Sequence, residues 1–334
     1  MIKLGIIGVG GWGKNLLRNF QEQPGAEVAV AADKVADRRD AAQKKYPEIT
    51  LTGDYREILT RDEIRAVVVA TPGASHFGIA RDCLKAGKDV FVEKPMALTA
   101  ADCRELCRLA EEGRLILMVG HLLLYHPAVG KLKEEVEAGT IGDLYYLYSQ
   151  RLNLGKIRRS ENALWTFAPH DVSIALHLIG RPPSAVAARG GSYIQSEVAD
   201  VAFLTIAFPD GVMAHIHVSW LDPHKVRKVT IVGSRKMLVF DDMDSLEPVR
   251  IYDKGVPEQL AYDTYGEYLN LRYGDVQIPW VRAGEPLRAE TGHFLDCVRE
   301  RKTPLTDGRN GLAVVSVLEA AQRSLEEGGR TVEL

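Results

Sequence analysis

No stretch of the 334-residue sequence reaches the apolar length of a membrane span, which argues against a membrane protein. The chain also lacks a strong charge bias, since 42 basic and 45 acidic residues leave a net charge of −3. Nothing in that balance favours nucleic acid or an acidic membrane surface as a partner. Four cysteines are too few for a disulfide framework in a chain of this length. Because no secretory signal pattern precedes the first apolar segment, we expect a cytoplasmic protein.

None of the cysteine and histidine spacings predicts a metal site. Cys103 and Cys107 lie one helical turn apart, but no nearby histidine or cysteine completes a ligand set. His215 and His217 share one face of a predicted strand. That spacing is more typical of a polar sheet face, solvated or at a subunit interface. We therefore predict no bound metal.

What the sequence does contain is a glycine-rich turn near its start. Residues 3–7 form an apolar run that predicts a buried strand, and residues 15–20 follow a helical pattern. Between them the order is G-x-G-x-x-G, in which the glycines permit a tight turn, close approach of a pyrophosphate, and close packing of the helix. Unpaired N–H groups at the helix start then face the phosphates. The predicted dinucleotide site comprises Gly8, Gly10, Gly11, Trp12 and Gly13, with an unliganded glycine-rich turn as the alternative.

An acidic residue lies where a dinucleotide site needs one. Residues 27–33 predict a second strand that ends in Asp33, 20 positions after Gly13. A carboxylate there accepts hydrogen bonds from ribose hydroxyls and repels a 2′-phosphate, so we predict NAD in preference to NADP. Lys34 and Arg38 follow closely and partly offset that repulsion.

Strands and helices alternate through the first 122 residues. Further apolar runs at 66–70, 88–92 and 115–119, separated by helical patterns, predict a doubly wound parallel Rossmann sheet of the α/β class. Ligands bind such sheets at the carboxyl ends of the strands. The residues that follow these strands are therefore candidate cofactor contacts: Thr71, Pro72, His76, Glu93, Lys94 and His121.

The pattern changes after residue 122. Strand-like segments dominate at 144–152, 186–194, 201–208, 212–220, 228–232, 237–240 and 249–252. They predict an α+β domain with a large, mostly antiparallel open sheet, and helices at 169–179, 287–299 and 311–327. We expect two domains, with residues 1–122 for dinucleotide binding and residues 123–334 for substrate binding and oligomerisation.

Glu93-Lys94-Pro95 at the end of a Rossmann strand, with Thr71-Pro72 and His76, resembles the Gfo/Idh/MocA oxidoreductases, named for glucose-fructose oxidoreductase and inositol dehydrogenase. That family also carries a histidine at the start of a helix ending in Leu-x-Gly, which His170 and Leu178-Ile179-Gly180 match. The resemblance extends along the whole chain. It implies that Lys94 and His170 are catalytic and face the nicotinamide and the substrate carbon. It also implies a homodimer or homotetramer formed through the open sheet.

The chemistry of these two residues suits hydride transfer from a secondary alcohol. A histidine can remove the hydroxyl proton near neutral pH, and such a base contributes roughly 10²–10⁴-fold to the rate. The Lys94 ammonium would stabilise negative charge that develops on the oxygen. Pro95 is expected to follow a cis peptide bond. The alternatives are a surface lysine in a salt bridge and a histidine at a helix cap.

Two positions depart from the family pattern. Relatives often have an acid four residues before the histidine, where this chain has Thr166, and many have arginine in place of Leu123. A hydroxyl cannot hold a proton-accepting imidazole as a carboxylate does, so Lys94 is expected to carry more of the acid–base chemistry. Asp171 is adjacent to His170 but points about 100° away on a helix, and we expect it to make another contact.

The segment 151–159 is basic in an otherwise balanced chain and precedes Trp165, which suits a phosphorylated or acidic sugar. In this segment and in residues 121–127 the chain resembles the sugar-nucleotide 3-dehydrogenases of the family. Those enzymes oxidise UDP-N-acetylglucosamine, or its glucuronic acid form, at C3. The resemblance implies NAD-dependent oxidation of a UDP-N-acetyl-hexosamine to the 3-keto sugar. The expected substrate contacts are Lys94, Tyr125, Arg151, Asn153, Lys156, Trp165, His170 and Asp171.

Three other interpretations stay open. The segment 151–159 is equally compatible with a solvated basic loop. The enzyme could act on a free sugar or polyol with NAD or NADP, as inositol dehydrogenases do. A non-catalytic dinucleotide-sensing regulator could use the same scaffold, although it would not need Lys94 and His170.

Overall fold

Contacts divide the chain into two compact units. The computed structural model describes residues 1–155, 157–158, 161–256 and 271–334. One unit comprises Met1–Tyr125 with Gly284–Glu319, and the other His126–Ala283 with Ala320–Leu334. We predicted a single boundary after residue 122. The first unit also takes the segment 284–319, because α8 (Pro286–Glu300) packs against α1 (Gly13–Glu22) and the short η2 helix (Leu122–Tyr125). Within the described residues, no helix has the length and apolar character needed to cross a membrane.

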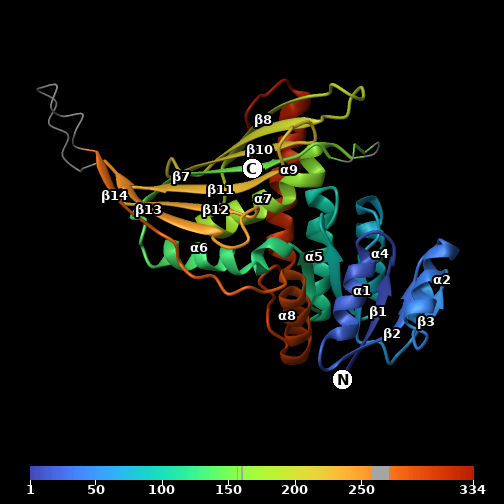
Figure 1. The fold of residues 1–334 in the computed structure, drawn as a ribbon. Helices are drawn as coiled ribbons and strands as arrows, with labels where there is room; N and C mark the ends of the chain where they lie inside the picture. The colour runs from blue at the N-terminus through green and yellow to red at the C-terminus, as the bar shows by residue number, and fades with distance from the viewer. Residues whose placement is uncertain (156, 159–160, 257–270) are drawn as a thin grey trace, which may run out of the picture. The chain divides into compact units, whose positions relative to one another are not determined.

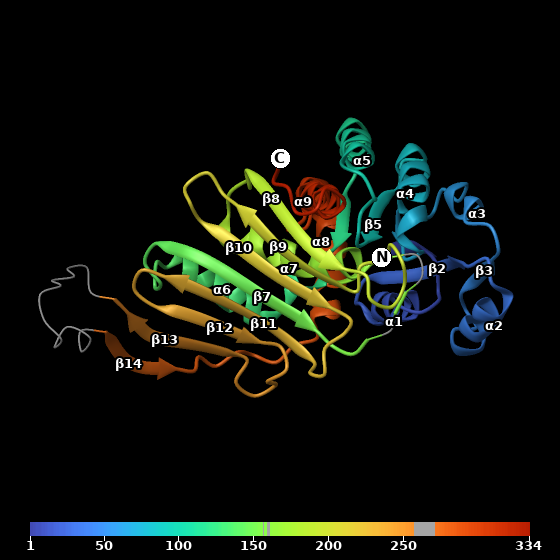
Figure 2. The ribbon, with the colours of Figure 1, turned by 90° about the horizontal axis from the view of Figure 1, so that it is seen from above.

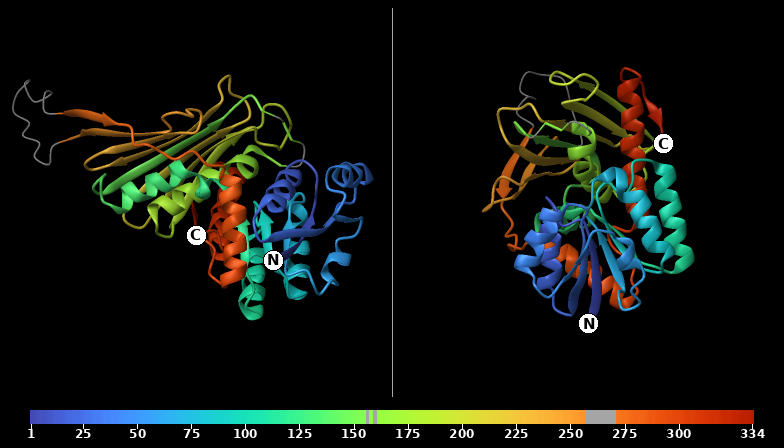
Figure 3. Two further views of the ribbon diagram at one scale, coloured as in Figure 1. Left: turned by 60° about the horizontal axis from the view of Figure 1, so that its bottom comes forward. Right: turned by 90° about the vertical axis from the view of Figure 1, so that its right-hand side faces the viewer.

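The first unit is built on a six-stranded parallel sheet with the order β3-β2-β1-β4-β5-β6, which confirms the predicted Rossmann sheet (Figure 1). The order reverses between β1 and β4, and the carboxyl ends of these strands mark where such sheets bind ligands. Helices cover both faces of the sheet (Figure 3). The strands are β1 (Ile2–Ile7), β2 (Ala26–Ala32), β3 (Thr50–Thr52), β4 (Ala66–Val69), β5 (Asp89–Glu93) and β6 (Leu117–Gly120). The other helices are α2 (Ala36–Lys45), α3 (Arg56–Leu59), η1 (Gly73–Ser75), α4 (His76–Lys85) and α5 (Ala100–Gly113).

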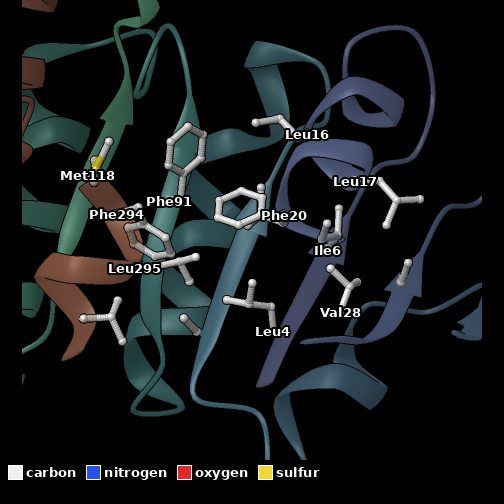
Figure 4. Close-up of a cluster of buried hydrophobic side chains, with 14 of the residues drawn as sticks. Leu4, Ile6, Leu16, Leu17, Phe20, Val28, Phe91, Met118, Phe294 and Leu295 are labelled. Atoms are coloured by element: carbon white, nitrogen blue, oxygen red, sulfur yellow. The ribbon is translucent and has the colours of Figure 1, made fainter. Parts of the chain in front are cut away.

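The central strands are apolar because both of their faces are covered. Every residue of β4 is buried, and so is Phe91 of β5. Phe91, Phe20 of α1 and Phe294 of α8 meet edge to face, with ring centroids 5.7 to 6.0 Å apart (Figure 4). The helix α8, which comes from the C-terminal part of the chain, is therefore part of the core that supports the sheet.

The second unit contains a nine-stranded sheet of the predicted, mostly antiparallel kind (Figure 2). Its order is β14-β13-β12-β11-β7-β10-β9-β8-β15, and β7 and β10 pair in parallel. The helices α6 (Pro127–Glu137) and α7 (Ala163–Ile179) pack against one face. The strands are β7 (Leu144–Leu152), β8 (Ala185–Gly191), β9 (Val201–Ala207), β10 (Met213–Ser219), β11 (Val226–Gly233), β12 (Met237–Asp241), β13 (Val249–Gly255), β14 (Arg272–Gln277) and β15 (Val332–Glu333). The helix α9 (Gly308–Glu326) contributes to both units.

The uncovered face of this sheet carries large side chains. Along β10, Ala214 and Ile216 are buried on the side of α7, whereas Met213 and His215 are exposed on the other. The His217 ring stacks on Phe203 of β9, with centroids 4.2 Å apart. This alternation confirms that His215 and His217 share one face of the sheet.

The start of α7 and the strand β14 differ from the sequence prediction. The helix α7 begins at Ala163 and not at Pro169, because the Asn162 side chain accepts a hydrogen bond from Trp165 N (3.0 Å) and caps an earlier first turn. His170 consequently lies inside the helix, directly after Pro169, and not at its start. The sequence does not predict β14, because every residue of this strand is exposed and no apolar alternation marks it.

Candidate functional site

The glycine-rich turn between β1 and α1 has the geometry that a dinucleotide pyrophosphate needs. Gly8 has a φ of +93°, and a Cβ there would lie 2.7 Å from the Ala70 carbonyl oxygen. A Cβ on Gly13 would lie 2.0 Å from the Gly8 carbonyl oxygen, so α1 can begin this close to β1 only without a side chain. Lys14 N and Asn15 N at the start of α1 donate to the carbonyl oxygens of Gly10 (3.1 Å) and Trp12 (2.8 Å). Among the described residues, no side chain caps this helix and no acid lies in its first turn, so no side-chain charge there competes with an anion.

Asp33 follows β2 and lies beside this turn. Its carboxylate accepts hydrogen bonds from Val9 N and Val35 N, each 3.0 Å long. Arg38 Nη1 lies 3.6 Å from Asp33 Oδ2, and a Cβ on Gly10 would come within 2.9 Å of the same nitrogen. Asp33 therefore lies beside the glycine-rich turn, and Arg38 offsets part of its charge.

Thr71 and His76 follow β4 and connect its end to the next strand. Ser75 Oγ donates a hydrogen bond to Thr71 Oγ1 (2.8 Å). His76 is buried, and its Nδ1 and Nε2 each lie 2.7 Å from a carbonyl oxygen, of Pro95 and Thr71 respectively. A neutral ring donates one such bond, whereas an imidazolium donates both. His76 thus joins the Thr71-Pro72 turn to the turn that follows β5.

The Glu93-Lys94-Pro95 turn follows β5, and its Lys94–Pro95 peptide bond is cis, as predicted. Glu93 Oε1 accepts a hydrogen bond from Trp12 Nε1 (2.6 Å), and Oε2 accepts one from Lys94 N (3.2 Å). Burial raises the pKa of Glu93 to about 7, although the Lys94 charge and the Trp12 bond oppose the shift. The Trp12–Glu93 bond joins the glycine-rich turn to the strand end that carries Lys94.

His121 follows β6 and is held by a residue from near the end of the chain. It is 1% exposed, and its Nδ1 lies 2.7 Å from Asn310 Oδ1 in α9. Burial lowers the pKa of His121 to about 4, the Asn310 bond opposes the shift, and the Lys94 charge adds to it. The ring is therefore neutral at pH 7. Because an amide oxygen only accepts, Nδ1 carries the hydrogen and Nε2 is left as an acceptor.

Tyr125, an expected substrate contact, is engaged inside the first unit. Its hydroxyl lies 3.0 Å from Thr306 Oγ1, and its ring packs on His293 with centroids 5.3 Å apart. Burial raises the pKa of Tyr125, so it is a neutral phenol. Asn310, Thr306 and His293 all come from the segment 284–319, and no motif in the sequence points to them.

In the second unit, His170 lies on α7 and is partly exposed. One turn before it, Thr166 Oγ1 donates to the Asn162 carbonyl oxygen (3.0 Å) and accepts from Trp220 Nε1 (3.1 Å). Thr166, where the family resemblance implies an acid, therefore connects α7 to Trp220, which directly follows β10.

Asp171, which we expected to point away from His170, contacts residues of β7. It is 1% exposed, and its Oδ2 accepts a hydrogen bond from Arg151 Nε (2.6 Å). Its Oδ1 accepts from Arg151 Nη2 (3.2 Å) and Ser149 Oγ (2.5 Å). Arg151 and Ser149 both lie on β7, so these hydrogen bonds join α7 to the sheet at the residue directly after His170.

The same pair engages one of the basic residues of the segment 151–159. The charge of Arg151 is neutralised by Asp171, and Arg158 Nη1 lies 2.7 Å from Glu161 Oε2. Lys156 lies outside the described residues. The described part of the segment therefore offers less positive charge to a phosphate than the sequence suggests.

Two further expected substrate contacts lie in the second unit. Asn153 follows β7, and its buried Oδ1 has no hydrogen-bond partner among the residues that the structure describes. Trp165 is partly exposed, and its Nε1 donates to Gln322 Oε1 (3.3 Å). In the described ranges, no group of three or more His, Cys, Asp or Glu side chains is arranged to hold a metal ion.

Both halves of the chain match described protein families. Residues 2–121 match the oxidoreductase family with an NAD-binding Rossmann fold, GFO_IDH_MocA, and residues 129–239 match the GFO/IDH/MocA C-terminal domain. The chain belongs to the Gfo/Idh/MocA oxidoreductase family. It is therefore an oxidoreductase whose first unit carries an NAD-binding fold.

Similar proteins include a curated dehydrogenase and two solved structures. The scyllo-inositol 2-dehydrogenase (NAD(+)) of Bacillus subtilis is 24% identical over 343 residues, covering 98% of this chain and 95% of its own. UDP-N-acetylglucosamine 3-dehydrogenase GnnA from Acidithiobacillus ferrooxidans shares the fold with a TM-score of 0.84, at 23% identity over 98% of both chains. GenD2 from gentamicin A biosynthesis, solved with NAD, has a TM-score of 0.83 at 22% identity, covering 100% of this chain and 96% of its own. Some other curated relatives are matched over little more than half of their length.

Proposed function

We propose that this Gfo/Idh/MocA oxidoreductase oxidises a UDP-N-acetyl-hexosamine at C3 to a ketone, with NAD as the hydride acceptor. The observation that carries the oxidation is the Trp12–Glu93 hydrogen bond, since it joins the dinucleotide turn to the strand end that bears Lys94. The bare glycine turn, the uncapped start of α1 and the Asp33 carboxylate fit a dinucleotide. Asp33 also supports NAD in preference to NADP.

Each residue has a defined part in this proposal. The N–H groups at the start of α1 hold the pyrophosphate, and Asp33 accepts hydrogen bonds from the ribose hydroxyls. When bound, the nicotinamide supplies the hydride acceptor. Lys94 stabilises negative charge on the substrate oxygen as the C–H bond breaks. His170 removes the hydroxyl proton, and the Arg151–Asp171 pair fixes the helix on which it lies.

The choice of a sugar nucleotide is supported by the shared fold with GnnA and by the resemblance of segments 121–127 and 151–159. One observation favours a second candidate, a free-sugar or polyol dehydrogenase. Because Asp171 neutralises Arg151, less positive charge remains for a diphosphate. The scyllo-inositol 2-dehydrogenase, matched along nearly its whole length, is named for a substrate without phosphate. A dinucleotide sensor without catalysis is the third candidate.

A panel of UDP-sugars, free hexoses and inositols, each with NAD and with NADP, separates these candidates. NADH or NADPH absorbance reports turnover. We expect turnover with NAD and a UDP-N-acetyl-hexosamine, and loss of it in Lys94→Met and His170→Asn. Turnover with inositol or free hexoses, but with no UDP-sugar, would support a free-sugar or polyol dehydrogenase instead. Full biological function of a Lys94→Met variant would favour the sensor.

We also propose that the chain forms a homodimer or homotetramer through the uncovered face of the nine-stranded sheet. Exposed large side chains on this face support the proposal, since Phe203 is 43% and Met213 49% exposed. Analytical ultracentrifugation of the parent and of a Phe203→Glu, Met213→Glu variant is the test. We expect the variant to dissociate. An unchanged oligomer, or a monomeric parent, would contradict this interface.

A further inference from the structure

Glu290 is a carboxyl group in the core of the first unit that no step above uses. It lies on α8 with an exposed fraction of 0%, and among the described residues neither of its oxygens has a hydrogen-bond partner. It shares the inner face of α8 with Leu287 and Phe294, which belong to the hydrophobic core. Burying a charged carboxylate that has no partners costs much free energy, so Glu290 is protonated and neutral in the folded protein.

The position of Glu290 along α8 brings it level with Glu93. Phe294 of α8 contacts Phe91 of β5, with ring centroids 5.7 Å apart. The two elements run in opposite directions, since Arg301, directly after α8, bonds Asp89 at the start of β5 (2.7 Å). Four residues back along α8 cover about 6 Å, and two residues forward along β5 cover about 6.6 Å. Both steps lead toward the same edge of the sheet and end at the two carboxyl groups.

Glu93 lies two residues after Phe91 on β5, and so on the same face of the strand as Phe91, which contacts Phe294 of α8. A Cβ on Gly120 would lie 3.1 Å from Glu93 Oε1, so the carboxyl group lies beside the end of β6. The η2 helix, which follows β6, packs on α8. The charge of Glu93 adds to burial in raising the pKa of Glu290. Glu93 has two N–H donors, from Trp12 and Lys94, whereas Glu290 has none in the described structure. Glu93 therefore ionises first.

The other titratable groups near the pair do not compensate its charge. His121 after β6 is neutral, since its pKa is about 4, and Tyr125 in η2 is a neutral phenol because burial raises its pKa. On α8 itself, burial lowers the pKa of His293, so this ring is also neutral at pH 7. Gln23, which directly follows α1, is uncharged and bonds Thr291, while Arg18 of α1 is paired with Glu285 at the start of α8. Among the described residues, the Lys94 charge acts on Glu93 and opposes the rise of its pKa.

We infer that Glu93 and Glu290 form a proton-holding pair, which rests with one proton on Glu290 and takes up the proton that substrate oxidation releases. This inference rests on the proposed function. In that reaction the substrate C–H bond breaks with its electron pair going to the nicotinamide, the O–H bond breaks, and the C=O bond forms. The Glu93 carboxylate takes up the released proton. The pair then loses one proton to solvent, so that alcohol and NAD⁺ give ketone, NADH and H⁺.

The protonation of the pair can be tested without turnover. Infrared difference spectra compare the parent, Glu290→Gln and a control, Thr291→Val, each with NAD at pH 7. Thr291 is the next residue of α8, is also buried, and donates its hydroxyl hydrogen to the Leu287 carbonyl oxygen. We expect the carbonyl stretch of a protonated carboxyl group in the parent and the control, and its loss in Glu290→Gln. A parent without a band that this substitution removes would overturn the inference.

Transfer of the proton is tested by kinetics with the alcohol found in the panel. Glu290→Gln and Glu290→Met should lower kcat by about tenfold or more, against roughly 10²–10⁴-fold for a direct acid–base residue. Both Glu290 variants should shift the pH dependence of kcat and leave KM for NAD unchanged. Thr291→Val should leave the pH dependence of kcat unchanged. Unchanged kcat and pH profile in both Glu290 variants would overturn the proton transfer. If no alcohol is oxidised, the proposed function fails, while the infrared comparison still decides the state of the pair.

Discussion

Asp171→Asn should destabilise the protein far more than loss of an equally short ion pair on its surface. Asp171 is almost completely buried and accepts three hydrogen bonds, two from Arg151 and one from Ser149. Asparagine presents a donor to the guanidinium in place of one acceptor oxygen and leaves the Arg151 charge buried without a counter-charge. Removing one partner of a buried pair costs about 3–5 kcal/mol in the free energy of unfolding.

The matched control is the Arg108–Glu112 pair on α5. It has the same nitrogen–oxygen distance of 2.6 Å as the buried pair, but its side chains are 56% and 60% exposed. Solvent screening leaves such a pair with about 0–1 kcal/mol, so Glu112→Gln should change the free energy of unfolding by less than about 0.5 kcal/mol. Urea denaturation followed by circular dichroism measures both variants.

A double variant separates the burial of charge from the loss of the contact. Replacing both partners, as in Arg151→Met with Asp171→Leu, removes the unpaired charge and should recover most of the lost stability. Turnover of the double variant should stay low, because α7, which carries His170, then loses its polar contact with β7. If Asp171→Asn costs less than about 1 kcal/mol, or no more than Glu112→Gln, the reasoning that buried geometry sets the strength of this pair is wrong.

Three further predictions concern the first unit. Lys94→Met should lower kcat by about 10²–10³-fold with little change in the affinity for NAD, since its charge acts mainly in the transition state; stopped-flow NADH absorbance and calorimetry measure the two quantities, and unchanged turnover would contradict the role. Gly13→Ala should lose most NAD affinity in calorimetry because its Cβ would meet a carbonyl oxygen at 2.0 Å, whereas Gly78→Ala in open space on α4 should bind normally and gain about 0.5–1 kcal/mol of stability. His121 has a pKa lowered from 6.5 to about 4, so the folded state resists protonation and the free energy of unfolding should fall by about 3 kcal/mol as the pH drops through this window. His121→Gln should flatten that part of the stability–pH curve, and an unaltered slope would show that the ring is accessible.

The Rossmann half was predictable because its signals are local. The buried strands read as short apolar runs, and the glycine spacing and Asp33 lie within one βαβ unit of sequence. The Glu93-Lys94-Pro95 turn is likewise a contiguous motif at a strand end. Such features depend on neighbours in the chain, and sequence patterns record those neighbours directly.

Features that depend on distant partners could not be predicted in the same way. We predicted Arg151 as a substrate contact in a basic segment, and nothing in the sequence shows that Asp171, 20 residues later, neutralises its charge. The start of α7 was placed too late because a proline usually marks a helix boundary, yet the Asn162 cap extends the helix before it. The fully exposed β14 carries no apolar alternation to read.

The segment 284–319 explains why the dinucleotide-binding half is not complete at residue 122. Val119 N donates to the Thr306 carbonyl oxygen (2.8 Å), so this segment covers the edge of β6, which would otherwise expose unpaired backbone groups. It also supplies Phe294 to the core and Asn310 to His121. Glu290 brings a buried acid to the level of Glu93, the residue that bonds the glycine-rich turn through Trp12. The chemistry at the end of β5 therefore depends on residues from both ends of the chain, and the cofactor half reaches its final form only when the C-terminal helices have joined it.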